Sequence, residues 1–317
     1  MTERTLQQRR RRVRLRDLET LVTVVQSGGM RKAAAVLHLS QPAVSRAMRE
    51  LEEALGVRLL QRGATGAEAT MHGEALVQRA RAVFDELHNA LQELDWLSDP
   101  EAGEVRVGGG DTQQVGVLAI TAQTLLTRHA RLRLCFEQAQ AHELVDLMLP
   151  QRLVDLAVIR PAVLPLRPDI EGEPLYHEQL FVVVGPDHPL ARRRKLALAE
   201  LLDARWILSR NELMPGTPVV QAFAQAGLPM PERVIEAGTL GLRHRLLMGG
   251  PFVTCMPHTV LPFVRRQLAL RTLPVDLPRW AEPTMVLWLR GRVPAPATRA
   301  CLDVLREVAA TLQPPAA

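Results

Sequence analysis

The run Leu39-Ser40-Gln41-Pro42-Ala43-Val44-Ser45-Arg46 decides how the first part of this chain folds. Ser40 is suited to cap the start of a helix, and Pro42 is tolerated in a first turn because the N–H that it lacks would be unpaired there. Apolar residues then recur four, three and four positions apart, at Val44, Met48, Leu51 and Leu55. This spacing places them on one face of a helix. Gly56 follows, and glycine commonly ends a helix because it adopts the left-handed cap conformation easily.

The opposite face of this predicted helix carries polar and basic side chains, and such side chains read base edges in the major groove or bind phosphates. Contacts to base edges or adjacent phosphates are expected from Gln41, Ser45 and Arg49, with Pro42 against a thymine methyl group. Phosphate contacts are expected from Arg31, Lys32, Arg46 and Arg62. For any single residue the alternative is an ordinary solvated surface position, but the group as a whole indicates DNA binding.

The positive charge of the chain is concentrated around this segment. Residues 1–70 hold 13 Lys and Arg against 7 Asp and Glu, a charge of +6, and the remainder holds 26 against 27, a charge of −1. A basic region joined to a neutral body is typical of a DNA-binding head. The arginine-rich tail within residues 1–14 is expected either to follow phosphates or to remain solvated.

Neighbouring segments complete a winged helix-turn-helix over residues 15–72. Helices are predicted from Leu15 to Ser27 and from Met30 to Leu37, separated by Gly28-Gly29. The stretch from Arg58 to Thr70 has the turn-rich composition of a two-stranded wing.

Beyond the wing, residues 73–98 change to a heptad pattern. Apolar residues alternate steps of four and three at Leu76, Ala80, Val83, Leu87, Ala90, Leu94 and Leu97. A repeat of about 3.5 residues over this length predicts a coiled coil, and therefore a dimerising linker helix. The alternative is an amphipathic helix that packs on its own domain. Residues 99–104 contain Pro100 and Gly103 and are expected to form a hinge.

The remainder, residues 105–317, alternates strand-like and helical segments, which predicts an α/β domain with mainly parallel pairing. Strands are expected at 104–107, 132–136, 155–159, 180–184, 206–208, 233–236, 252–255, 270–273 and 285–289. A final helix from about Ala297 to Leu312 follows a strand that rejoins the first subdomain. We expect a cleft between two subdomains, one of residues 105–162 and 284–317 and the other of residues 163–283.

Composition and missing motifs exclude several classes of protein. Aromatic residues make up only 3%, too few to stack the bases of single-stranded nucleic acid. Cys135, Cys255 and Cys301 show no paired spacing, which argues against disulfides or zinc and fits a reducing cytoplasm. No His-x-x-x-His pair and no Gly-x-Ser-x-Gly motif occurs, so we expect no metal, no cofactor and no enzymatic activity. No apolar stretch could span a bilayer or serve as a signal core.

Several motifs make the whole sequence resemble the LysR-type transcriptional regulators. They are residues 16–21, Ala33-Ala34, residues 39–45 and 51–62, Thr70-Met71-His72-Gly73, Asp187-His188-Pro189-Leu190-Ala191 and Met256-Pro257. The resemblance implies a winged DNA head, a dimerising linker helix and a periplasmic-binding-protein-like effector domain, assembled as a homotetramer and controlled by a small metabolite. Two heads on one linker dimer imply a palindromic operator in double-stranded DNA.

The sequence departs from the family pattern at three places. Gly29-Met30-Arg31-Lys32 replaces the usual Gly-Ser-Phe-Thr, so the hydroxyl cap is missing and two cations stand there. Ala69 replaces a leucine of the wing, and Gly250-Pro251-Phe252 replaces a Gly-x-Gly turn.

The effector is expected at the carboxyl ends of strands, where open α/β sheets bind ligands. Asp111 and Thr112 follow the first strand and precede a helix. The resemblance implies further contacts from Thr112, Gln138, Gln140, Ser209 and Asn211, although an ordinary loop role is the alternative for each. Three cations favour an anionic effector, namely Arg160, Arg210 and Arg243. Asp111 argues against an anion if it points into the cleft.

Two other functions fit part of the sequence. A solute-binding protein would account for residues 104–317 alone, but it would need an export signal in place of the basic head. An enzyme with a helix-turn-helix regulatory domain would need a catalytic constellation, which the sequence does not offer.

Overall fold

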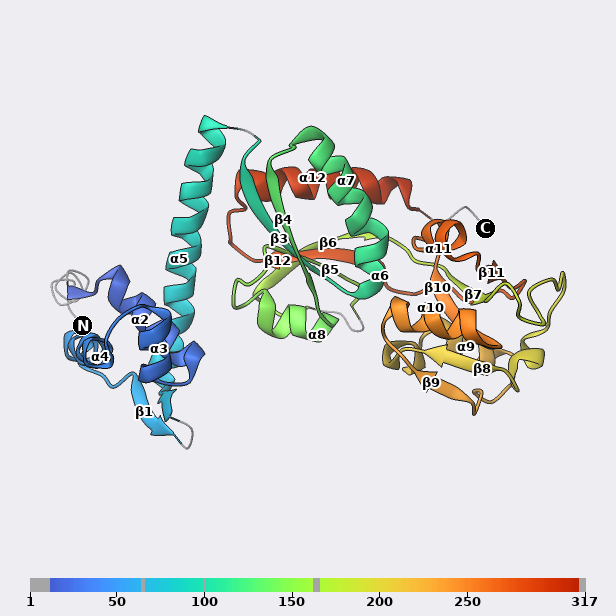
Figure 1. The fold of residues 1–317 in the computed structure, drawn as a ribbon, viewed down its shortest axis with the longest axis horizontal. Helices are drawn as coiled ribbons and strands as arrows, with labels where there is room; N and C mark the ends of the chain where they lie inside the picture. Colours follow the sequence, from blue (N-terminus) through green and yellow to red (C-terminus); the bar gives the residue numbers. More distant parts are fainter. Residues whose placement is uncertain (1–11, 64–65, 100, 162–165, 314–317) are drawn as a thin grey trace. The chain divides into compact units, whose positions relative to one another are not determined.

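The computed structural model describes residues 12–63, 66–99, 101–161 and 166–313 (Figure 1). These residues fall into two compact units, Met1–Leu91 and Gln92–Ala317, each with its own hydrophobic clusters. Most of the predicted arginine-rich tail and the side chain of Arg62 lie outside the described part.

The first unit contains the three predicted helices followed by the wing. The helices are α2 (Leu15–Ser27), α3 (Met30–Val36) and α4 (Gln41–Leu55); the wing pairs β1 (Leu60–Gly63) with β2 (Gly66–Ala69) in antiparallel fashion. The predicted ends of α4 are confirmed. Ser40 Oγ accepts a 3.3 Å hydrogen bond from the Ala43 N–H, and Gly56 takes the left-handed conformation at φ 71°.

A small apolar core joins these helices. Val44, Met48 and Leu51 of α4 cluster with Leu21 and Val24 of α2, and all five are almost completely buried. Each buried aliphatic side chain contributes about 1.5–3 kcal/mol relative to an exposed one. This packing fixes which face of α4 remains in solvent.

The helix α5 (Met71–Ser98) begins directly after the wing. Thr70 connects the two elements, because its hydroxyl donates to the Arg58 carbonyl at 2.7 Å and accepts from the Gly73 N–H at 3.1 Å. A Cβ atom at Gly73 would lie 2.1 Å from the Leu59 carbonyl oxygen, so this close approach requires glycine.

Much of the predicted heptad face of α5 is exposed in the single chain. Val83, Leu87, Leu94 and Leu97 are 43%, 43%, 60% and 76% exposed. These side chains therefore do not pack against other parts of the same chain. This favours the coiled-coil interpretation over the alternative of an amphipathic helix packed on its own domain.

The second unit contains two five-stranded sheets. The first has the order β4-β3-β5-β12-β6 and consists of β3 (Gly103–Gly109), β4 (Leu132–Gln138), β5 (Leu156–Ile159), β6 (Ile170–Tyr176) and β12 (Thr284–Leu289). The second has the order β11-β7-β10-β8-β9 and consists of β7 (Leu180–Val184), β8 (Arg205–Leu208), β9 (Val234–Glu236), β10 (Phe252–Pro257) and β11 (Arg271–Thr272). The last strand, β12, rejoins the first sheet as predicted.

The prediction of mainly parallel pairing is wrong, because both sheets are mixed. β3 is parallel to β4 and β5, and β8 is parallel to β9 and β10. β12 is antiparallel to β5 and β6, and β7 is antiparallel to β10 and β11. β7 and β12 are the strands by which the chain enters a sheet from the other sheet, without the helical crossover that makes neighbouring strands parallel.

The sequence does not predict β6, because Gly172 and Pro174 interrupt its apolar pattern. β6 is an edge strand of the first sheet, where proline is tolerated. Residues 170–176 therefore belong to the first subdomain, and the expected start of the second subdomain at residue 163 is wrong.

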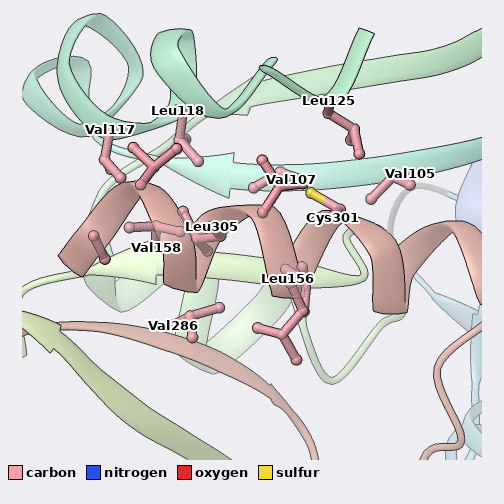
Figure 2. Packing of buried hydrophobic residues seen from close by; sticks show 14 of the residues in the cluster. Val105, Val107, Val117, Leu118, Leu125, Leu156, Val158, Val286, Cys301 and Leu305 are labelled. Atoms are coloured by element: carbon pink, nitrogen blue, oxygen red, sulfur yellow. The ribbon is translucent and has the colours of Figure 1, made fainter. Parts of the chain in front are cut away.

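Helices cover both faces of each sheet. On the first sheet, η1 (Gln114–Leu118), α7 (Ala119–Arg128) and α12 (Pro296–Thr311) share one core, and η2 (Leu144–Met148) belongs to a second. Figure 2 shows Cys301 and Leu305 of α12 pointing toward the strand residues Val107 and Val158. The second sheet carries η3 (Leu198–Leu201) and α9 (Pro218–Gln225) in one cluster, and α10 (Leu240–Gly249) and α11 (Leu261–Leu268) in another.

Candidate nucleic-acid interface and ligand cleft

The solvent side of α4 carries side chains predicted to contact DNA. Gln41, Pro42, Arg46 and Arg49 are exposed, and Ser45 is half-buried. These residues lie opposite the face that Val44 and Met48 bury in the core. The side chains are thus available to a groove of DNA, and their individual roles stay predictions.

A concave surface of about 750 Å3 lies between α4, the start of α3 and the wing. It brings together five of the predicted residues, Arg31, Lys32, Gln41, Ser45 and Arg49. Sequence reasoning missed Arg58, which lines the same surface. The sequence did offer a signal for this residue, because Arg58 is a cation that stands just before the first strand of the wing. Pro42 and Arg46 lie outside this lining.

The wing is held against the helices by two local features. Glu52 of α4 accepts hydrogen bonds from the N–H groups of Leu59 and Leu60 at 2.7 and 3.1 Å, so its carboxylate is used within the fold. Gly66 has φ 141°, and a Cβ atom there would lie 2.5 Å from the Gly28 carbonyl oxygen. Helices and wing therefore form one continuous basic surface.

The start of α3 shows the consequence of the departure at residues 29–32. Gly29 occupies the cap position and no side chain accepts the first N–H groups of α3. Arg31 and Lys32 are exposed and face the concave surface. Two cations thus replace a neutral cap at a position adjoining the predicted DNA contacts.

In the second unit, a cleft of about 360 Å3 lies where β3, β4, β5 and β8 end. All six predicted effector residues line it, and they are Asp111, Thr112, Gln138, Gln140, Ser209 and Asn211. The topology explains this, because residues that follow strand ends in the two subdomains meet at one opening. Their contact with a ligand stays a prediction.

Two hydrogen bonds cross the cleft from one subdomain to the other. Asp111, in the short helix α6 (Asp111–Gln113), accepts a bond of 2.5 Å from the Leu240 N–H at the start of α10. The Asn211 side-chain amide lies 3.5 Å from Gln140 Oε1, at the limit of a hydrogen bond. Asp111 therefore points into the cleft.

One of the three predicted cations, Arg243, forms a buried ion pair. Its guanidinium contacts both carboxylate oxygens of Glu212, at 2.5 and 3.2 Å, and its Nε donates to the Ala237 carbonyl at 3.0 Å. Burial by itself lowers the pKa of Arg243, but the charge and hydrogen bonds of Glu212 outweigh it and leave the pKa raised. Glu212 also accepts hydrogen bonds from the Ser209 N–H and hydroxyl at 2.6 and 2.8 Å.

A second predicted cation, Arg160, is also paired. It forms a hydrogen-bonded ion pair with Glu178, which is 1% exposed. Its guanidinium lies 3.6 Å from the centroid of the Trp280 ring, in cation–π geometry. Arg210, the third candidate, is exposed and does not line the cleft.

Sequence reasoning missed the acidic side chains of the cleft, Glu143, Glu178 and Glu212. Glu212 stands three residues after Ser209 and completes a capping box with it at the start of η4 (Arg210–Leu213). That spacing was visible in the sequence. The pairing of Glu178 with Arg160 depends on tertiary structure.

Within the described ranges, no three His, Cys, Asp or Glu side chains are grouped so as to hold a metal ion. No helix in that part of the chain is both long and apolar enough to cross a membrane.

Comparison with known proteins identifies the family of both regions. Residues 15–74 match the bacterial regulatory helix-turn-helix proteins of the lysR family, and residues 98–310 match the LysR substrate binding domain. The transcriptional regulator GbpR of Azospirillum brasilense is 29% identical over 304 residues, which cover 95% of this chain and 88% of that protein. A probable hydrogen peroxide-inducible genes activator of Streptomyces viridosporus is 30% identical over 256 residues, 81% of each protein.

A solved structure shows the same fold. Full-length CbnR, crystallised in complex with its target DNA, superimposes with a TM-score of 0.65 at 22% identity, covering 93% of this chain and 100% of that one. The solute-binding interpretation leaves the match of residues 15–74 unexplained, and the interpretation as an enzyme with a helix-turn-helix domain leaves the match of residues 98–310 unexplained. The chain belongs to the LysR family of transcriptional regulators, with a helix-turn-helix DNA-binding domain and an effector-binding domain.

Proposed function

We propose that this protein binds a palindromic operator in double-stranded DNA through residues 15–72, and dimerises through the linker helix of residues 73–98. The basic concave surface of the first unit supports the first assignment, because it combines polar side chains of α4 with cations, which are the kinds of side chain that read bases and bind phosphates. The exposed heptad positions of α5 support the second. A homotetramer of two such dimers, located in the cytoplasm with the DNA, completes the proposal.

We further assign residues 105–317 to the binding of a small-molecule effector. The cleft at the strand ends supports this, since it is of the size used for small ligands and polar side chains from both subdomains converge on it. A ligand that contacts both subdomains can change their relative arrangement, which is how it would alter DNA binding.

The binding of operator DNA is tested by gel shift with the full-length protein and the intergenic DNA upstream of its own gene. Titration is repeated over a salt series, with a shuffled sequence of equal length as the control. We expect the intergenic DNA to bind at least 10^3-fold more tightly than the shuffled DNA, the lower end for specific sites. Equal affinities at every salt concentration would contradict the proposal.

A thiol-based response to peroxide is not supported at Cys255 or Cys301, although one relative is named as a probable activator of hydrogen peroxide-inducible genes. Cys255 and Cys301 are buried, and burial raises the pKa of both thiols, that of Cys301 to about 12. A peroxide sensor needs an accessible thiolate, and neither residue supplies one.

A further inference from the structure

We infer that the cleft of the second unit selects an uncharged small molecule that carries several hydroxyl or amide groups, and that it discriminates against anions. This inference rests on the proposed function, which assigns the cleft to the effector. It is carried by the partners of each charged side chain that lines the cleft.

The guanidinium of Arg243 already donates hydrogen bonds to acceptors within the protein. Besides Glu212 and the Ala237 carbonyl, its Nη1 donates to Thr254 Oγ1 and the Cys255 carbonyl at 3.3 and 3.1 Å. Arg243 is only 4% exposed. A ligand anion would have to displace Glu212, which would leave a buried carboxylate without its counter-ion.

Arg160 is paired through one of its guanidinium nitrogens. Its Nη1 donates a hydrogen bond to the Glu178 carboxylate, and the Trp280 ring covers the guanidinium plane. Because Glu178 is buried, a ligand that drew Arg160 away would again strand a carboxylate in the protein interior. The Nε, Nη1 and Nη2 atoms of Arg243 are therefore all occupied by protein acceptors, and the charge of Arg160 is balanced by Glu178.

The whole lining is also acidic. It contains four carboxylates, on Asp111, Glu143, Glu178 and Glu212, against the two guanidinium groups of Arg160 and Arg243. The field in the cleft thus repels anions. This argues against the expectation from sequence that three arginines would favour an anionic effector.

The other two carboxylates accept hydrogen bonds from backbone N–H groups in place of an arginine side chain. Asp111 accepts from the Leu240 N–H, and Glu143 accepts from the Gln140 N–H at 2.8 Å, each at the first turn of a helix. Helix N-termini stabilise such charges, so the carboxylates do not depend on a ligand cation. The rest of the lining is uncharged, and its polar side chains are Thr112, Gln113, Gln138, Gln140, Ser209, Asn211 and Thr239. Hydroxyl and amide groups both donate and accept hydrogen bonds, which matches ligands of the same chemistry.

The test is a thermal-unfolding screen of the full-length protein with size-matched probes in three charge classes. Glucose, inositol and small carboxamides form the uncharged class, glucuronate and gluconate the anions, and glucosamine and small amines the cations. At 100 times Kd an uncharged ligand should raise Tm by about 5–10 °C. Gln138→Ala should weaken its binding about threefold to tenfold. The matched control is Gln225→Ala at an exposed position of α9, which should leave the affinity unchanged.

An uncharged probe that raises Tm and loses affinity in Gln138→Ala supports the inference. It is overturned if an anion or a cation gives the largest cleft-dependent shift, or if no uncharged probe shifts Tm. The gel shift described above needs no ligand, so sequence-selective DNA binding in the same preparation shows that the inference alone has failed.

Discussion

The Asp111 carboxylate of the first subdomain accepts a 2.5 Å hydrogen bond from the Leu240 N–H of the second. This bond crosses the cleft and places a negative charge at the first turn of α10, where the helix dipole favours it. A residue that sequence reasoning assigned to ligand contact thus also links the two subdomains.

Replacing Asp111 should loosen the start of α10. In Asp111→Ala the Leu240 N–H loses a charged acceptor of the kind worth about 0.5–2 kcal/mol at a helix start. Amides in the first turn of α10 should exchange with deuterium several-fold faster, as measured by mass spectrometry of peptides from that helix. Asp187→Ala, at an exposed position, is the control. Equal exchange in the two variants would show that this hydrogen bond contributes nothing.

The buried pair of Arg243 and Glu212 should dominate the stability of the second subdomain. Arg243→Met leaves Glu212 buried without a counter-ion, which costs about 3–5 kcal/mol. Combining it with Glu212→Gln should recover part of the loss. Urea unfolding followed by tryptophan fluorescence measures both variants. Arg128→Ala breaks the exposed pair with Glu307 and should leave the unfolding midpoint unchanged; a loss as large as that of Arg243→Met would refute the role of burial.

Asp155 should make stability depend on acid pH. Burial raises the pKa of Asp155, but hydrogen bonds from Arg106 and the charges of Arg292 and Arg106 outweigh it, so the pKa is lowered overall. The unfolded value is about 3.9, so this contribution is present above pH 4 and is lost as the pH falls through the folded value.

Urea midpoints at pH 6 and pH 3 test this dependence. The wild type should lose more stability between the two values than Asp155→Asn does, because the variant lacks the titrating group. Asp203→Asn, an exposed carboxylate, should behave like the wild type. A wild-type profile that parallels the Asp155→Asn profile would contradict the assignment.

Gln41 should contribute to discrimination between DNA sites. A bidentate contact to a base is worth about 1–3 kcal/mol against the wrong base, so Gln41→Ala should lower the ratio of specific to random affinity about tenfold or more. Arg62→Ala should instead weaken all DNA alike and lower the salt slope by about one. Gln26→Ala, at an exposed position of α2, is the control. Equal losses on specific and random DNA for Gln41→Ala would remove this residue from base recognition.

The heptad face of α5 should hold the dimer together. Leu94 is 60% exposed in the single chain, and Leu94→Asp places a charge where a partner helix would pack. Sedimentation velocity should show a shift toward monomer, and affinity for a palindromic site should fall with it. Glu93→Gln, exposed and off the heptad positions, should stay a dimer. An unchanged sedimentation coefficient in Leu94→Asp would place the dimer interface elsewhere.

Local sequence signals were sufficient to predict the structure of most of the first unit. Ser40, Pro42 and Gly56 fix the ends of α4 through capping chemistry, which acts within one or two turns of the chain. The spacing of Val44, Met48 and Leu51 fixes its buried face in the same local way. The helices, the wing and the solvent-facing side of α4 could therefore be predicted without a tertiary structure.

The sequence by itself determined the helix-turn-helix, the heptad face of α5, most strands of the second unit and six of the residues that line its cleft. Only the tertiary structure placed β6 at a sheet edge and paired Arg243 with Glu212 and Arg160 with Glu178. The physical reason is the distance along the chain over which each interaction acts. Caps and periodicity act between neighbours in the chain, whereas strand order and the charge of a cleft depend on residues that only folding brings together.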